Sequence, residues 1–220
     1  MKKRNLFIIA IVALIGVAFI FNACKKDTDT TAPVITLKGS NPMTLVFNVT
    51  WAEPGFTATD DVDGDVTSKV TVSGTVNNIS AGLYTLTYSV KDAAGNTGTA
   101  TRKVTVDAGA FLAGTYSVVD VSNGVTTDYS DNITASTTTL NKINVAKFGD
   151  YSSGAVYMTL SGTNVDLPSQ VVHCGTPPND VDHTFQGTGT FTTSHKITIT
   201  FSDNSEFGDF TGCTETYTIQ

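Results

Sequence analysis

The stretch YTLTYSV at residues 84–90 alternates apolar and hydroxyl-bearing side chains, with Tyr84, Leu86, Tyr88 and Val90 at every second position. Successive side chains of a β-strand point to opposite faces of a sheet, so these four residues share one face. We expect that face to lie in a core. Threonine and serine on the other face are typical of an antiparallel sheet with one side in water.

Similar short alternating runs, separated by turn residues, lie on both sides of this stretch between residues 32 and 107. Such spacing is typical of a β-sandwich. The loop at 92–96 joins the last two runs, and its Gly95 and Asn96 tolerate the positive φ of a hairpin. The other strands that we expect here lie at 34–37, 44–49, 56–58, 69–73 and 100–106.

A second block covers residues 109–220 and opens with a strand at 111–120, entered through Gly114. In the run KITITF at 196–201, the apolar side chains again share one face. Successive antiparallel strands with short turns predict a second sandwich or an up-and-down barrel, whose mouth could hold a small ligand. The whole body is therefore expected to be all-β. The further expected strands lie at 132–135, 142–145, 155–160, 184–190 and 214–219.

Residues 1–23 have the features of a secretory signal, with a basic start and sixteen apolar residues at 6–21. That run is shorter than the roughly 20 residues of a spanning helix. It ends in FNAC at residues 21–24, which resembles the lipobox of bacterial lipoproteins. The resemblance implies cleavage before Cys24, acylation of its thiol with chains such as palmitate, and a firm membrane anchor.

Residues 24–31 are polar and are expected to form a flexible stalk. The charged residues directly after Cys24 resemble the surface-export signal of Bacteroidetes lipoproteins, which implies the cell-surface leaflet of the outer membrane. Cleavage before Cys24 leaves 10 basic against 20 acidic residues, a net charge of −10. This charge argues against nucleic acid and anionic lipid as partners.

Five segments of the first block, at 31–35, 53–56, 59–65, 82–88 and 92–96, follow in order the pattern of bacterial immunoglobulin-like domains related to the hyalin repeat. The resemblance implies an immunoglobulin-like sandwich that serves as a spacer or adhesive module, without catalysis. The Gly-Thr-Tyr opening of the second block resembles the lipocalin-like C-terminal domains that follow such modules in Bacteroides-type lipoproteins.

The loop DDVDGD at 60–65 places carboxylates at alternate positions, Asp61, Asp63 and Asp65. Carboxylate oxygens that converge in this way suit Ca²⁺, with Asp92 or Asn96 as further donors. The loop lacks the glutamate that closes a helix–loop–helix calcium site. The alternative is a turn in which aspartates accept hydrogen bonds from their own backbone. Calcium is the only cofactor that the sequence suggests.

Two cysteines remain beyond Cys24, namely Cys174 and Cys213. In an oxidising compartment we expect them to form a disulfide, and closing a loop of about 40 residues would stabilise by roughly 3–4 kcal/mol. The neighbouring side chains carry atoms that can bind a metal but lack the regular spacing of a zinc site. We therefore favour a loop held by the disulfide. Those neighbours are His173, Asp180, Asp182 and His183.

The sequence contains neither a Gly-x-Ser-x-Gly nucleophile motif nor a phosphate-binding glycine loop. We therefore expect no enzyme but a binding module for glycan or another extracellular ligand, accessory to nutrient capture or adhesion. The alternative is a structural or assembly protein that contacts other envelope proteins. Exposed aromatic rings would stack on a sugar. The candidates are Trp51, Tyr129, Tyr151 and Tyr157.

Overall fold

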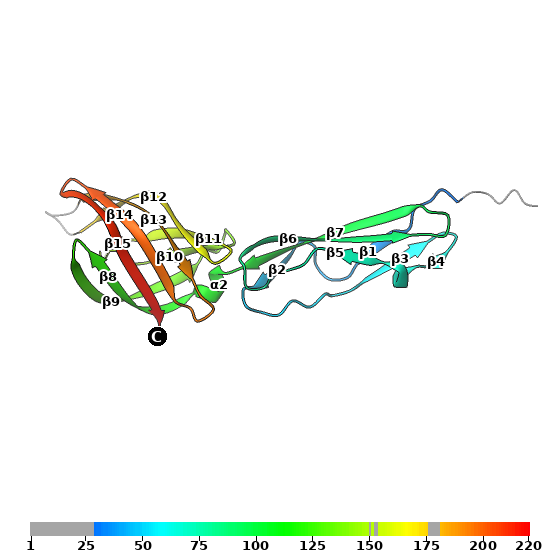
Figure 1. The fold of residues 1–220 in the computed structure, drawn as a ribbon, viewed down its shortest axis with the longest axis horizontal. Coiled ribbons are helices and arrows are strands. Elements are labelled where there is room, and N and C mark those ends of the chain that lie inside the picture. The colour runs from blue at the N-terminus through cyan, green and yellow to red at the C-terminus, as the bar shows by residue number, and fades with distance from the viewer. Residues whose placement is uncertain (1–28, 150, 152–153, 176–180) are drawn as a thin grey trace, which may run out of the picture.

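The computed structural model describes residues 29–149, 151, 154–175 and 181–220. Its regular secondary structure consists almost entirely of strands, arranged as a sandwich followed by a barrel (Figure 1). The all-β prediction is therefore confirmed. The signal peptide and Cys24 lie outside the described residues, so the anchor stays a prediction. In the part of the chain that is described, no helix has both the length and the apolarity needed to cross a membrane.

The first unit contains two sheets. One has the strand order β1 (Val34–Leu37), β3 (Phe56–Asp60), β4 (Gly64–Asp65). The other has the order β2 (Met43–Val46), β7 (Thr97–Asp107), β6 (Gly82–Lys91), β5 (Thr71–Ser73). All pairs are antiparallel except β2 with β7, and a short 3₁₀ turn, η1 (Thr67–Lys69), precedes β5.

The alternation at residues 84–90 has the predicted consequence. Leu86, Tyr88 and Val90 are buried on the inner face of β6, and Tyr84 is half-buried. On β7 the same period-2 rule turns Arg102, Val104 and Val106 inward, so that a guanidinium group lies fully buried in the sandwich.

The second unit is a closed barrel in which each strand pairs antiparallel with the next and the last pairs with the first. Of the two predicted architectures, the up-and-down barrel is the one that forms. Its first four strands are β8 (Gly114–Ser122), β9 (Val125–Ala135), β10 (Lys142–Val145) and β11 (Val156–Ser161). The other four are β12 (Asn164–Cys174), β13 (Val181–Phe191), β14 (Ile197–Ser205) and β15 (Gly208–Ile219).

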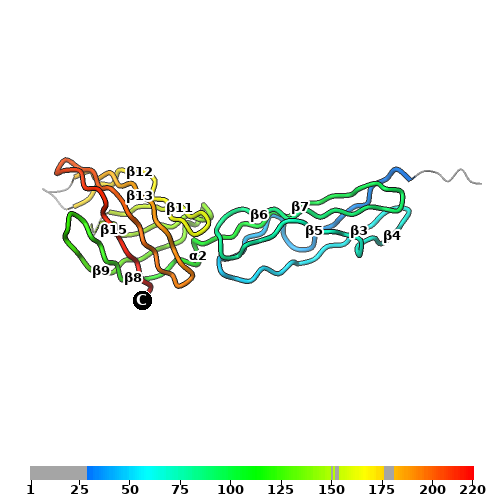
Figure 2. The backbone as a smooth tube through the Cα atoms, in the orientation of Figure 1, coloured from blue at the N-terminus to red at the C-terminus, as the bar shows by residue number. Residues whose placement is uncertain are grey.

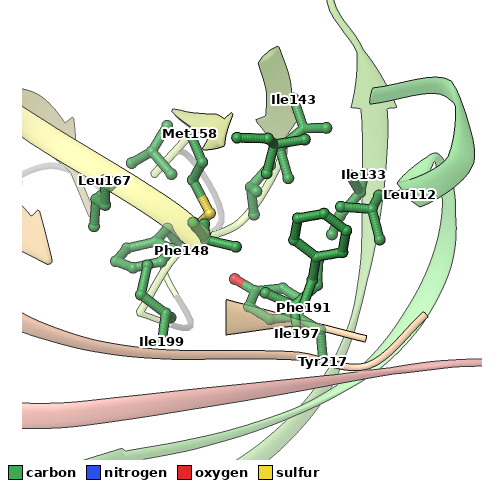
Figure 3. Packing of buried hydrophobic residues seen from close by; sticks show 14 of the residues in the cluster. Leu112, Ile133, Ile143, Phe148, Met158, Leu167, Phe191, Ile197, Ile199 and Tyr217 are labelled. Carbon is green, nitrogen blue, oxygen red and sulfur yellow. The ribbon is translucent and has the colours of Figure 1, made fainter. Parts of the chain in front are cut away.

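Side chains fill the barrel (Figure 3). Ile197, Ile199 and Phe201 are buried on one face of β14, as the sequence predicts, and Phe201 packs against the ring of Phe148 at 4.7 Å between centroids. Gly187 and Gly189 face β14 from β13, and a Cβ at either position would clash with a carbonyl oxygen of β14. The absence of side chains there leaves room for the large residues opposite.

The sandwich and the barrel share one hydrophobic cluster. Phe47 of the sandwich packs on Phe111, in the short helix α2 (Gly109–Leu112), and on Phe191 of the barrel, at 4.9 and 5.1 Å between centroids. Ala81 and Gly162 exchange two backbone hydrogen bonds of 2.8 and 2.7 Å across the junction. The two units therefore form a continuous elongated body (Figure 2).

Candidate functional site

The end of the barrel that lies away from the sandwich carries an open depression of about 600 Å³. β12 begins beside the junction at Gly162 and runs to Cys174, which places its second end far from the sandwich. Polar side chains from the ends of four strands and from the β14–β15 turn line the depression. They are His173, Asp182, Asn204, Ser205, Glu206 and Asp209.

Phe207 lies in the β14–β15 turn, beside Glu206 of the depression, and is 66% exposed. Among the described residues it is the only phenylalanine, tyrosine or tryptophan that is exposed rather than buried or half-buried. Sequence reasoning missed it because the search for ligand-binding rings considered only tryptophan and tyrosine. The available signal was the run Asn204-Ser205-Glu206-Phe207-Gly208, in which a turn glycine follows an apolar ring in a polar segment.

Two histidine–carboxylate pairs lie on opposite sides of the barrel wall at this end, one in the lining of the depression and one in the interior. His173 Nδ1 is 2.9 Å from Asp182 Oδ1 on the outer surface, where both side chains are exposed. His183 Nδ1 is 2.7 Å from Asp203 Oδ1 in the interior. The two histidines therefore do not form a common metal site, while Asp180 lies outside the described residues.

A buried carboxyl group, that of Glu215, lies deeper in the barrel and is 0% exposed. Its Oε1 accepts hydrogen bonds from the Tyr129 hydroxyl (2.6 Å) and the Gly149 N–H (2.7 Å), and its Oε2 accepts one from the Tyr217 hydroxyl. Burial raises the pKa of Glu215 to about 7, and the charge of Asp120 acts in the same direction. Such a group can exchange a proton near neutral pH, but its side chain is closed off from the surface.

The four aromatic residues predicted to bind a ligand are not brought together. Tyr129 and Tyr151 turn into the barrel, where Tyr129 bonds Glu215 and the Tyr151 hydroxyl lies 3.4 Å from Asp203. Burial raises the pKa of Tyr151 far above its ordinary value. Tyr157 is half-buried under the Lys142 ammonium, 3.7 Å from the ring centroid. Trp51 is half-buried in the sandwich, between β2 and β3.

The structure departs from the predicted disulfide, because Cys174 and Cys213 are separate buried thiols. Two strands lie between β12 and β15, which puts the cysteines about 14 Å apart around the wall, against the 4.4–6.8 Å between Cα atoms that a disulfide needs. Their heights differ as well, since Cys174 pairs with Val181 at the end of β13 and Cys213 with Phe201 in mid-β14. Burial raises the pKa of Cys174 to about 11.

The acidic loop takes the form of the alternative, a hydrogen-bonded turn. Asp60 Oδ1 accepts from the N–H groups of Val62 and Asp63, at 3.0 and 2.8 Å, and Asp65 Oδ1 accepts from Thr67 at 2.9 Å. The N–H of Ala93 donates to Asp63 Oδ2 at 2.6 Å. The predicted calcium ligands Asp61, Asp63 and Asp65 are not among the carboxylates that lie close together in the described residues. Asp63 and Asp65 instead accept hydrogen bonds from backbone N–H groups.

These features define an all-β protein in which an immunoglobulin-like sandwich carries a closed eight-stranded barrel. Residues 35–106 match the model of a family described as the Ig-like domain of bacterial surface proteins. The resemblance stated for the first block is thereby confirmed. No match to a curated protein was found.

Two solved structures are similar to parts of this chain. The lipoprotein BT2262 from Bacteroides thetaiotaomicron is 16% identical, with a TM-score of 0.35 over 84% of this chain and 99% of that one. A structure of CBM51-2 in complex with GlcNAc and INT domains from Clostridium perfringens ZmpB is 19% identical, with a TM-score of 0.30. That match covers 46% of this chain and 29% of the other. Both TM-scores are low, so neither neighbour informs the function.

Proposed function

We propose that this protein is a lipoprotein anchored through Cys24 in the outer membrane, which displays its barrel at the cell surface as a non-catalytic binding module. The ligand class that fits is a neutral glycan, taken up at the far end of the barrel. The observation that carries the proposal is the exposed Phe207 ring, which follows Glu206 of the polar depression in the same turn.

The chemistry of this end matches a sugar better than it matches an apolar ligand. An aromatic ring can stack on the apolar face of a pyranose, while carboxylate and amide groups exchange hydrogen bonds with its hydroxyls. Asp182, Glu206 and Asp209 make the depression acidic, and the mature chain carries a net charge of −10. Negatively charged glycans are therefore disfavoured.

The arrangement of the two units supports display away from a membrane. β6 begins next to the junction residue Ala81, so the β6–β7 hairpin lies at the opposite end of the sandwich. Asn96 in that hairpin donates a hydrogen bond to the backbone carbonyl of Asp29 (3.2 Å), which places the N-terminal segment there. The anchor and the depression would thus lie at opposite ends of the body (Figure 1).

The anchor is tested by metabolic labelling with a clickable fatty acid. We expect the wild-type protein to carry the label and Cys24→Ser to carry none, because only that thiol follows the lipobox. Cys174→Ser serves as the matched control and should be labelled as fully as wild type. Label on Cys24→Ser would refute the anchor.

The binding role is tested by a glycan-array screen, followed by titration of the best hit with Phe207→Ala. We expect the variant to bind about tenfold more weakly, since a stacked ring contributes on the order of 1.4 kcal/mol. Leu83→Ala, at a similarly exposed apolar residue of the sandwich, should bind like wild type. An unchanged affinity in Phe207→Ala would refute this site. Capture of an envelope protein without any glycan hit would favour the assembly role instead.

A further inference from the structure

We propose that Asp29, Asp60 and Asp92 form a Ca²⁺ site at the end of the sandwich where the N-terminal segment enters. One carboxylate oxygen of each residue lies within 4.8 Å of the others. Two oxygens bound to one Ca²⁺ at about 2.4 Å each are at most about 4.8 Å apart, so this spacing suits a shared cation. The three residues come from the segment before β1, the end of β3 and the turn after β6.

An unpartnered oxygen points independently to a ligand. Asp60 is only 8% exposed, and its Oδ1 already accepts hydrogen bonds from Val62 and Asp63. Its Oδ2 is shielded from water and has no hydrogen-bond partner. Burying a carboxylate oxygen without a partner is costly, and such atoms are rare in folded proteins. A bound cation would supply the partner that Oδ2 lacks.

Asp92 is held in place as an ionised ligand. Its Oδ1 accepts from the N–H groups of Gly95 and Asn96, at 2.6 and 2.8 Å, and its Oδ2 accepts from the Asn96 side-chain amide at 2.7 Å. Burial acts to raise its pKa, but the hydrogen bonds from Asn96 and Gly95 outweigh burial, so the pKa of Asp92 lies below its usual value. The carboxylate is therefore charged at neutral pH.

Asp29 joins the N-terminal segment to the same hairpin. Its Oδ1 accepts from the Thr31 N–H (3.0 Å), and its backbone carbonyl accepts from the Asn96 amide. None of the three carboxylates forms an ion pair with another described residue. Three negative charges at this separation repel one another, and a divalent cation would offset that repulsion.

The donor set favours Ca²⁺ among divalent cations. All three side chains offer hard oxygen atoms, and neither histidine nor cysteine takes part, which argues against zinc. Ca²⁺ accepts irregular sets of six to eight oxygens, whereas Mg²⁺ demands a near-ideal octahedron. A bound Ca²⁺ would tie the segment that leads to Cys24 to the end of the sandwich. It would thus stiffen the base of the molecule, a role separate from ligand binding at the barrel.

The test compares the melting temperature of the full chain, purified in a non-ionic detergent, in millimolar CaCl₂ and in EDTA. We expect CaCl₂ to raise the melting temperature of the sandwich by about 5 °C or more. Asp60→Asn, which removes one charged oxygen at nearly constant shape, should abolish the shift. Asp61→Asn, at the exposed neighbour outside the cluster, should keep it. No shift in wild type, or an equal shift in Asp60→Asn, would overturn the site.

Calorimetric titration with CaCl₂ gives a second readout, which does not depend on how Asp60→Asn folds. Wild type should bind one Ca²⁺ per chain, and Asp29→Asn, placed before the first strand, should bind at least tenfold more weakly. Equal affinity in Asp29→Asn would overturn the proposal. An equally large melting shift in MgCl₂ would overturn the assignment to calcium. Neither result bears on glycan binding at Phe207.

Discussion

Replacing Arg102 with methionine is expected to lower the free energy of unfolding of the sandwich by about 2–4 kcal/mol, because the change leaves several acceptors of one buried guanidinium group without a donor. Arg102 is 0% exposed. Its Nη2 lies 3.2 Å from Glu53 Oε1 and donates to the carbonyl of Lys38 at 2.7 Å, while Nη1 donates to the carbonyl of Ser40 at 2.8 Å. Methionine fills the space but leaves these acceptors without a donor.

The loss should be large because one side chain holds a long segment without regular structure. Residues 38–55 contain only the short strand β2, and the guanidinium group contacts both ends of this segment, at Lys38 and at Glu53. Tyr88 completes the network, since its hydroxyl accepts from Arg102 Nε and donates to Glu53 Oε2 at 2.6 Å. Lysine cannot reproduce this fork of donors, so Arg102→Lys should recover only part of the stability.

Urea unfolding followed by Trp51 fluorescence measures the stability of the sandwich, because the only tryptophan lies there. Lys103→Met, at the exposed neighbour on β7, is the matched control and should stay within about 0.5 kcal/mol of wild type. A loss below about 1 kcal/mol in Arg102→Met would show that the buried charge contributes little net stability.

The strand pattern was readable wherever alternation was unbroken. Residues 84–90 and 197–201 bury the face that period 2 predicts, and the expected strand at 142–145 has the bounds observed. The same rule also places Arg102 on the inner face of β7, a signal present in the sequence. The inward position of Arg102 was not predicted, because charged residues are normally assigned to the surface.

β12 was not predicted from the sequence. Without this strand, which joins β11 to β13 in the closed barrel, the sequence could not distinguish a sandwich from a barrel. Pro168 lies in the middle of this strand, and the pairing with β13 shifts register between Leu167 and Gln170. Proline lacks the N–H that a ladder requires, so a run that contains it does not suggest a central strand. The Gln170 side chain compensates by bonding the backbone N–H and C=O of Tyr157 on β11, at 3.0 and 2.7 Å. No local sequence pattern predicts that a glutamine side chain will replace the missing backbone hydrogen bonds.

The candidate sites depend on contacts between distant segments, which local spacing does not encode. The acidic loop supplies only Asp60 to the trio of carboxylates, and the other two members come from the N-terminal segment and from the next hairpin. In the same way, the disulfide was predicted because only two cysteines remain beyond Cys24. In the barrel these cysteines lie on strands that are not neighbours, and both are free thiols. Of the three carboxylates, only Asp92 was predicted as a further calcium donor, because no local spacing relates it to Asp29 and Asp60.

The barrel is expected to lose about 3 kcal/mol of stability between pH 4 and pH 8 through Glu215. The pKa of this carboxyl is about 7 in the folded protein, against an ordinary value of 4.5. Between these values the folded state keeps a proton that the unfolded state has released, so the free energy of unfolding falls as pH rises. Each unit of pKa difference corresponds to about 1.4 kcal/mol. The contribution is fully present below pH 4.5 and is lost above pH 7.

Glu215→Gln should flatten this pH dependence, because glutamine resembles the protonated carboxyl group. Its amide oxygen can still accept from Tyr129 and Gly149, and no charge forms in the interior at high pH. At pH 8 the variant should therefore equal or exceed the wild type in stability. Urea titrations at several pH values, followed by tyrosine circular dichroism, measure the slope. Glu206→Gln, at an exposed carboxylate, is the matched control and should keep the wild-type slope.

Burial also raises the pKa of Asp131, so some loss of stability with rising pH should remain in Glu215→Gln. The decisive quantity is the difference between the two slopes rather than either slope alone, because the Asp131 contribution is common to both proteins. Equal slopes in wild type and Glu215→Gln would mean that the Glu215 carboxyl stays ionised inside the barrel. The hydrogen bonds from Tyr129, Tyr217 and Gly149 would then outweigh the cost of burying its charge.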